Sequence, residues 1–124
     1  MTTTTTTSIA STAIIPDIAL RQTSNEYHFA CSSNILYVYI DKDGTKISFS
    51  EKGIVPSDAT LRSLENLLFN KGFINLGSRI LFNLKKAQKV IEEDFVYYLI
   101  MTNGSRIKIS KVEADSLKSY LIEF

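Results

Sequence analysis

Cationic side chains gather in one part of this 124-residue sequence, although its formal net charge is only +1. Between Asn66 and Lys111, eight lysines and arginines stand against three acids, whereas the remaining residues carry six cations and ten acids. Within that region, the stretch from Phe73 to Lys89 holds four cations and no acid. Because lysine and arginine neutralise phosphates, such a local excess within a nearly neutral total indicates a surface that meets a polyanion.

Three predicted loops combine these cations with short polar side chains. In nucleic-acid contacts, cations hold phosphates and polar side chains reach base edges. We therefore expect phosphate contacts from Arg79, Lys85, Lys86, Lys108 and Lys111, and base contacts from Thr45, Asn75 and Ser78, with Lys46 beside Thr45. Each loop alone also fits an ordinary solvated turn, and the sequence does not show whether the three share a face.

Residues for other chemistry are few. The chain has one histidine, His28, and one cysteine, Cys31, which together supply neither a nucleophile with its base nor a metal-ligand set. No glycine-rich phosphate loop is present, and the acids at 92–94 fit a hairpin turn better than a metal site. We therefore expect no enzyme, no metal or other cofactor, and no small-molecule substrate.

The cellular location follows from segment lengths and cysteine usage. The longest apolar runs, at 35–40 and 95–101, have the length of strands and are too short to span a membrane. The N-terminus lacks the basic region of a signal peptide, and a single cysteine suits a reducing compartment. We expect a cytoplasmic protein with no membrane partner.

Aromatic and β-branched residues predict strands over most of the chain from residue 27 onward. The predicted strands cover 27–30, 35–41, 45–50, 89–92, 94–102 and 106–110, with a strand, loop and strand starting at Phe73. The dipeptide Asn103-Gly104 predicts a type I′ hairpin turn, in which both central residues have positive φ.

Two helices complete the pattern. Ser57 is the predicted N-cap of a helix over residues 58–69, whose leucines recur at helical spacing. Ser110 and Glu113 fit the capping box of a last helix that starts at Lys111. Its expected inward side chains are Val112, Leu117, Tyr120 and Leu121. The sum is a mostly β fold with short helices, of which one is internal and one is C-terminal.

The first 25 residues differ in composition from the rest. Thr2 to Thr7 is a homopolymer run, and a Ser/Thr/Ala-rich stretch without a period follows it. We predict a disordered tail over residues 1–25 and a single domain over residues 26–124. The apolar patches at 14–15 and 18–20 leave room for a short docking helix or strand.

The ordered blocks of this domain resemble the LytTR DNA-binding domain of bacterial response regulators. NILYVYID (34–41) resembles the family's first strand, D-I-x-Y-I-E, and TLRSLENLL (60–68) resembles its helix, S-L-x-x-L-E-x-x-L. FINLGSRILFN (73–83) stands where the family has F-x-R-x-H-R-S-x-L-V-N, and NGSRIKISK (103–111) resembles N-G-x-x-I-x-V-S-R.

The resemblance implies an elongated, mostly antiparallel β domain that inserts loops into successive major grooves. The family's DNA-contacting positions fall near Thr45 or Lys46, on Ser78 with its neighbour Arg79, and on Lys111. The chain departs from the family where Gly77-Ser78-Arg79 replaces His-Arg-Ser, and where Asn75 and Lys111 replace arginines. Because lysine lacks the bidentate fork that reads guanine, we expect weaker base specificity than in typical members.

The residues and the resemblance together predict a sequence-selective regulator of transcription that binds double-stranded DNA. We expect it to lack a receiver domain of its own and to act as a homodimer on repeated half-sites. The alternative is a protein-interaction module on the same fold that has lost specific DNA binding and uses its edge strands and tail.

Overall fold

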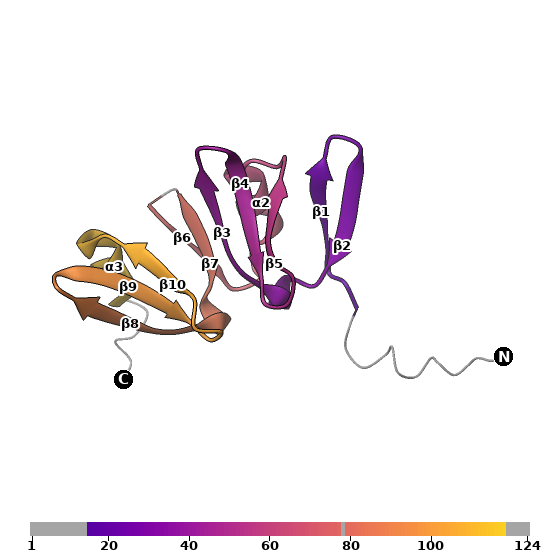
Figure 1. Cartoon of the computed structure of the whole chain (residues 1–124). Coiled ribbons are helices and arrows are strands. Elements are labelled where there is room, and N and C mark those ends of the chain that lie inside the picture. The colour runs from indigo at the N-terminus through magenta and orange to yellow at the C-terminus, as the bar shows by residue number, and fades with distance from the viewer. Residues whose placement is uncertain (1–14, 78, 119–124) are drawn as a thin grey trace.

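A computed structural model describes residues 15–77 and 79–118 of the chain, and over these residues the fold is built on antiparallel sheets (Figure 1). The central sheet has five strands in the order β5-β4-β3-β7-β6. Its strands are β3 (Ile35–Asp41), β4 (Gly44–Phe49), β5 (Gly53–Ser57), β6 (Phe73–Leu76) and β7 (Ile80–Asn83). The predicted mostly β architecture, with one internal and one C-terminal helix, is confirmed.

The central sheet has a hydrophobic core on each face, because successive side chains of a strand point to opposite sides. Val38 of β3 and its partner Leu81 of β7 pack toward helix α2 (Leu61–Leu67). Phe82, the next residue of β7, is fully buried in a second core on the other face. Strands β3 and β7 therefore support both halves of the molecule.

A three-stranded sheet covers the second core, in the order β10-β9-β8. Its strands are β8 (Ala87–Glu93), β9 (Val96–Met101) and β10 (Arg106–Ile109), and the 3₁₀ turn η2 (Leu84–Lys86) links it to β7. Helix α3 (Lys111–Lys118) follows β10.

The predicted capping box at the start of α3 is confirmed. The Ser110 backbone N–H donates to Glu113 Oε1 over 2.8 Å, and the Glu113 N–H donates to Ser110 Oγ over 3.0 Å. Leu117 is buried as predicted, but Val112 is 74% exposed, so its predicted inward position is wrong. Tyr120 and Leu121 lie outside the described residues.

An N-terminal hairpin of β1 (Ile18–Thr23) and β2 (Glu26–Ala30) stands beside the central sheet (Figure 1). Ile18 and Leu20 are buried in the α2-side core, which explains why a short strand forms there. Residues 18–23 thus form a strand and are not part of a disordered tail. This agrees with the alternative prediction of a short docking strand at the apolar residues. The division into residues 1–25 and 26–124 stays a prediction for residues 1–14, which lie outside the described part.

The hairpin turn with positive φ at both central residues is found at a different place from the one predicted. Asp94 and Phe95 have φ of 52° and 68° and form the two-residue connection between the paired Glu93 and Val96, so positive φ at both central positions occurs here. Asn103 is absent from the positive-φ residues, and only Gly104 of that dipeptide has positive φ. The predicted type I′ turn at Asn103-Gly104 is therefore wrong.

The internal helix is shorter than predicted and starts at a different cap. Ser57 ends strand β5, which the sequence did not predict, and Thr60 is the N-cap that accepts a hydrogen bond from the Ser63 N–H. Ser57 Oγ does accept from the Ala59 N–H over 3.1 Å, so it shapes the turn that precedes the helix.

Candidate nucleic-acid interface

Three cations from two separate parts of the fold converge on one depression. Arg79 in the turn before β7 lines it, as do Arg106 and Lys108 of β10 and Tyr37 and Tyr39 of β3. Its volume is about 240 Å³. The junction of the two sheets therefore brings Arg79 together with cations that lie far from it in the sequence.

The tyrosines of the depression are placed by strand alternation. Tyr37 and Tyr39 lie on the same face of β3, with ring centroids 5.8 Å apart. Burial, with smaller effects of Tyr37 and Asp41, raises the pKa of the Tyr39 hydroxyl. Tyr39 therefore keeps its proton at neutral pH and is a hydrogen-bond donor suited to a phosphate oxygen.

Arg106 is held in place by two contacts, and it is not among the contacts predicted from the sequence. Its Nη2 donates to Glu93 Oε1 over 2.9 Å, and its guanidinium lies 4.5 Å from the ring centroid of Tyr98. Cation–π stacking and an ion pair both restrict a flexible side chain. Arg106 could have been found from the alternation of polar and apolar residues in the last strand. Arg106 and Lys108 both point away from the buried Ile107 and Ile109.

Lys108 connects this depression to a second one at the start of α3. The second depression is lined by Lys108, Ser110, Lys111 and the β8–β9 turn at Phe95. We call Arg79, Arg106, Lys108 and Lys111 the cationic strip. Lys111 Nζ lies 3.2 Å from Asp115 Oδ2, which raises the pKa of this exposed lysine and keeps it charged.

The turn between β6 and β7 lies directly against α3. Gly77 has φ of 63°, and a Cβ at this position would collide with the Glu113 carboxylate that caps the helix. The positive φ therefore disfavours a side chain here, and the Glu113 carboxylate would have to shift to admit one.

Thr45 and Lys46, the predicted contacts at the first hairpin, point to opposite faces of β4. Lys46 pairs with Tyr39 and shares its face, but its Nζ is bound to Asp41 Oδ1 at 3.0 Å. Thr45 pairs with Ser57 and is only 8% exposed. The structure thus places Thr45 away from the cationic strip.

Asn75, another predicted base contact, does not face the cationic strip. Asn75 pairs with Leu81, which packs toward α2, and its neighbours Ile74 and Leu76 pack toward the other core. The half-buried Asn75 therefore points away from the face that carries Tyr37 and Tyr39. Ser78 lies outside the described residues.

Lys85 and Lys86 lie at the other end of β7 from Arg79, in turn η2 (Figure 1). The Lys86 carbonyl accepts from the Thr102 N–H over 2.8 Å, which ties this turn to the β9–β10 connection. The structure therefore brings Arg79, Lys108 and Lys111 together and leaves Lys85 and Lys86 outside the strip.

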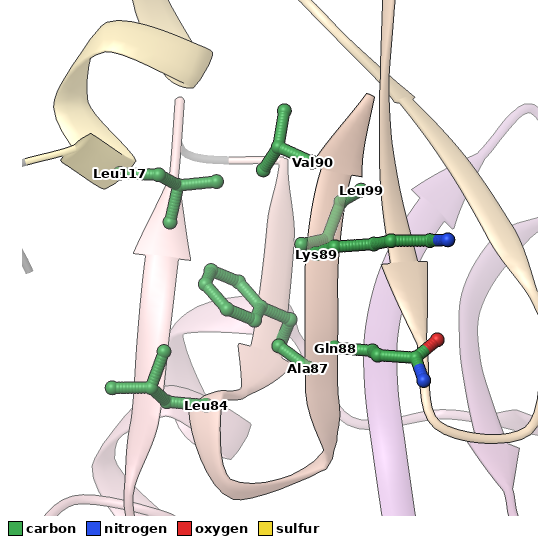
Figure 2. A pocket seen from close by; sticks show the side chains of 8 residues that line it. Leu84, Ala87, Gln88, Lys89, Val90, Leu99 and Leu117 are labelled. Carbon is green, nitrogen blue, oxygen red and sulfur yellow. The ribbon is translucent and has the colours of Figure 1, made fainter. Parts of the chain in front are cut away.

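A separate pocket of about 260 Å³ lies beneath the three-stranded sheet (Figure 2). Leu84, Ala87, Val90 and Leu117 surround it, whereas the side chains of the neighbouring β8 residues Gln88 and Lys89 point away. Most of its lining is apolar, and none of the cationic strip residues lines it. In the described part of the chain, no group of three or more His, Cys, Asp or Glu side chains could hold a metal ion, and no helix is long and apolar enough to cross a membrane.

Comparisons with known proteins agree on one family. The family model of the LytTr DNA-binding domain matches residues 25–122. Among solved structures, the chain is similar to the LytTr DNA-binding domain of a Bacillus cereus protein described as a methyl-accepting/DNA response regulator, with a TM-score of 0.66 and 19% identity. That match covers 86% of this chain and 97% of the other. No curated protein matches the chain.

Proposed function

Because the chain belongs to the LytTr DNA-binding domain family, we propose that it regulates transcription by binding double-stranded DNA sequence-selectively through the cationic strip. The observation that carries the proposal is the convergence of Arg79, Arg106 and Lys108 on one depression at the junction of two sheets. Lys108 continues the strip to Lys111 at the start of α3. A row of cations from separate elements fits a phosphate backbone better than a single loop would.

Within the proposed interface, the two kinds of contact fall to different residues. Lys108 and Lys111 hold phosphates, because an ammonium attracts phosphate without reading a base. Arg106 has the fork that can read guanine, and its contacts with Glu93 and Tyr98 orient it in advance. Ser78 lies outside the described residues and stays a base contact predicted from the sequence alone.

We further propose that two copies bind repeated half-sites. One domain offers a small interface, and single DNA-binding modules of this size commonly gain affinity and specificity by pairing. Binding to chromosomal DNA implies that the protein works in the cytoplasm of a bacterial cell.

A salt titration of two matched double variants tests the proposed interface. Lys108→Ala/Lys111→Ala removes two cations from the strip, and Lys85→Ala/Lys86→Ala removes the same charge from the opposite end of β7. Each lost phosphate contact reduces the slope of log K against log[salt] by about 0.9, so the strip variant should lose about 1.8. The control variant should keep nearly the native slope.

The binding measurement uses genomic DNA fragments over a range of salt concentrations. Equal losses in the two double variants would show that binding is diffuse and does not use the strip. If the native chain shows no salt dependence and no higher affinity than a neutral protein, the DNA-binding proposal is wrong.

A second candidate function, a protein-interaction module, is favoured by one observation. Tyr27 and Phe29 on β2 are 60% and 76% exposed. Exposed aromatics on an edge strand are typical of protein contacts. The same titration separates the candidates, since a module without DNA binding would show no salt-dependent binding for the native chain or for either double variant.

A further inference from the structure

Strand β2 is the outermost strand of the N-terminal hairpin, and it carries two large exposed aromatic side chains. Tyr27 and Phe29 alternate with His28, so both lie on the same face of the strand. They are 60% and 76% exposed. Within residues 15–77 and 79–118, no strand pairs with the outer edge of β2.

The inner edge of the hairpin is attached to the central sheet, which leaves β2 at the end of the molecule (Figure 1). Ser57 Oγ donates to the Arg21 carbonyl, and the Asp58 N–H donates to the Gln22 carbonyl over 3.3 Å. Strand β1 is thereby fixed beside β5, and β2 faces outward. Every second residue of an edge strand directs its N–H and C=O away from the sheet, so β2 offers a row of unpaired groups.

β2 lacks the charged protection that another edge strand of the molecule has. Strand β8, at the edge of the three-stranded sheet, carries Lys89, Glu92 and Glu93. Such charges discourage pairing between sheet edges. β2 has one acid, Glu26, at its first position, and it contains no lysine or proline.

The sequence of β2 is complementary to itself in one register. When two copies pair antiparallel with His28 opposite His28 of the second copy, all five residues of each strand are paired. Tyr27 then lies opposite Phe29 of the other copy, twice, and Glu26 lies opposite Ala30. Cross-strand aromatic pairs stabilise antiparallel strands, and no two acids face each other.

We propose that β2 is a self-association strand, through which two copies of this chain pair antiparallel about a twofold axis at His28. This pairing joins the two-stranded hairpins of the two copies into one four-stranded sheet. β10 and the start of α3, which carry most of the cationic strip, lie at the other end of the molecule from β2 (Figure 1). Each copy therefore keeps its strip free. The inference gives a surface to the pairing in the proposed function, but it does not depend on DNA binding.

Cysteine cross-linking of the full chain tests the register. In a Cys31→Ser background, His28→Cys places two thiols directly opposite each other, at a Cα separation that permits a disulfide. Oxidation should convert this variant rapidly to a covalent dimer. The matched control is Gln88→Cys in the same background, because Gln88 is also exposed on an edge strand. It should cross-link only at the slow rate of random collisions.

A second variant measures association without cysteines. Phe29→Asp should lower the average mass toward that of a monomer in light scattering at increasing concentration, because it places a charge opposite Tyr27. Phe95→Asp, a change of an aromatic that is 91% exposed elsewhere, should not change the mass. Since Phe29 is outside the core, the thermal unfolding of Phe29→Asp should remain close to native.

Three outcomes would overturn the inference. The first is a native chain that stays monomeric at all concentrations, and the second is equal cross-linking of the His28→Cys and Gln88→Cys variants. The third is a monomeric His28→Cys variant whose introduced thiol is protected from alkylation, which would mean that residues 1–14 cover β2. If the His28→Cys variant cross-links as expected but the native chain does not bind DNA, the proposed function is contradicted and the pairing is supported.

Discussion

Gly77 shows how one residue can fix the relation between two parts of the site. It is the point of contact between the β6–β7 turn and α3, and its missing side chain leaves room for the Glu113 carboxylate. That carboxylate is at the same time committed to the Ser110 N–H. The turn that carries Arg79 and the helix that starts at Lys111 are therefore positioned by the same contact.

Replacing Gly77 by alanine should destabilise the fold more than the same change at Gly104. Both glycines have positive φ, 63° and 90°, which costs an alanine about 1 to 2 kcal/mol. Only Gly77→Ala also forces a Cβ into Glu113, whereas nothing lies within 4 Å of a Cβ at Gly104. Urea unfolding of both variants measures the difference. Equal losses would show that Glu113 moves aside at no cost.

Thr45 and Lys46 are adjacent in the sequence, but only Lys46 lies on the face of the proposed interface. Thr45 and Lys46 were predicted together because both fall at a hairpin tip, but adjacent strand residues point to opposite faces. The sequence alone does not show which face of β4 meets the second sheet, because that depends on how the two sheets pack. Thr45 lies on the α2-side face of β4 with the buried Ile47, whereas Lys46 lies on the face that carries the tyrosines.

At the scale of elements, the sequence predicted those with a strong local signal. Strand β3 was predicted with its observed bounds because aromatic and β-branched residues fill it, and α3 was predicted because its capping box is local. Strand β1 lacks such a run, and β5 contains Pro56. Both depend on tertiary contacts: Leu20 of β1 enters the core, and β5 pairs along β4.

The N-terminal hairpin is anchored by a carboxylate that no pattern in the sequence singles out. Asp17 Oδ1 accepts from the Ser32 N–H over 2.7 Å, and its Oδ2 accepts from Ser32 Oγ over 2.6 Å. Lys71 Nζ lies 3.5 Å from the same carboxylate. Although partial burial opposes the shift, the Ser32 hydrogen bonds and the charge of Lys71 lower the pKa of Asp17.

The anchor should contribute to stability only when Asp17 is ionised. Because its folded pKa is below its ordinary value of 3.8, the contribution is complete above about pH 4 to 5 and is lost as the pH falls through the folded value. Asp17→Asn should therefore destabilise the chain at pH 7, by an amount that shrinks as the pH falls below 3.8. Urea unfolding at several pH values measures this.

A double-mutant cycle with Ser32→Ala isolates the pair. The coupling between Asp17→Asn and Ser32→Ala should be favourable at pH 7 and should shrink at low pH. A coupling that does not change with pH would mean that the ionised carboxylate is not its source.

At the scale of the whole molecule, the two ends of the fold carry different surfaces. The cationic strip lies where the three-stranded sheet meets β3 and β7, and the unprotected strand β2 lies at the far end (Figure 1). The central sheet connects them and has a core on each face. A regulator that binds DNA and pairs with a second copy needs such a separation, since either contact would otherwise obstruct the other.

The shared strands β3 and β7 also predict that the two cores unfold together. Leu64 in the α2-side core and Leu99 in the other core are 1% and 2% exposed. Replacing either by alanine should cost about 2 to 5 kcal/mol, since each leaves a cavity in a packed interior. Because β3 and β7 pack into both cores, each variant should shift the same single transition.

Native-state hydrogen exchange measured amide by amide distinguishes joint from separate unfolding. In Leu64→Ala, the slowest amides of β4 and of β9 should lose protection by the same amount, although β9 packs into the other core. The reverse should hold for Leu99→Ala. If Leu64→Ala accelerates exchange in β4 alone and leaves β9 unchanged, the two halves open independently. The strip, which spans both sheets, would then not be a rigid surface.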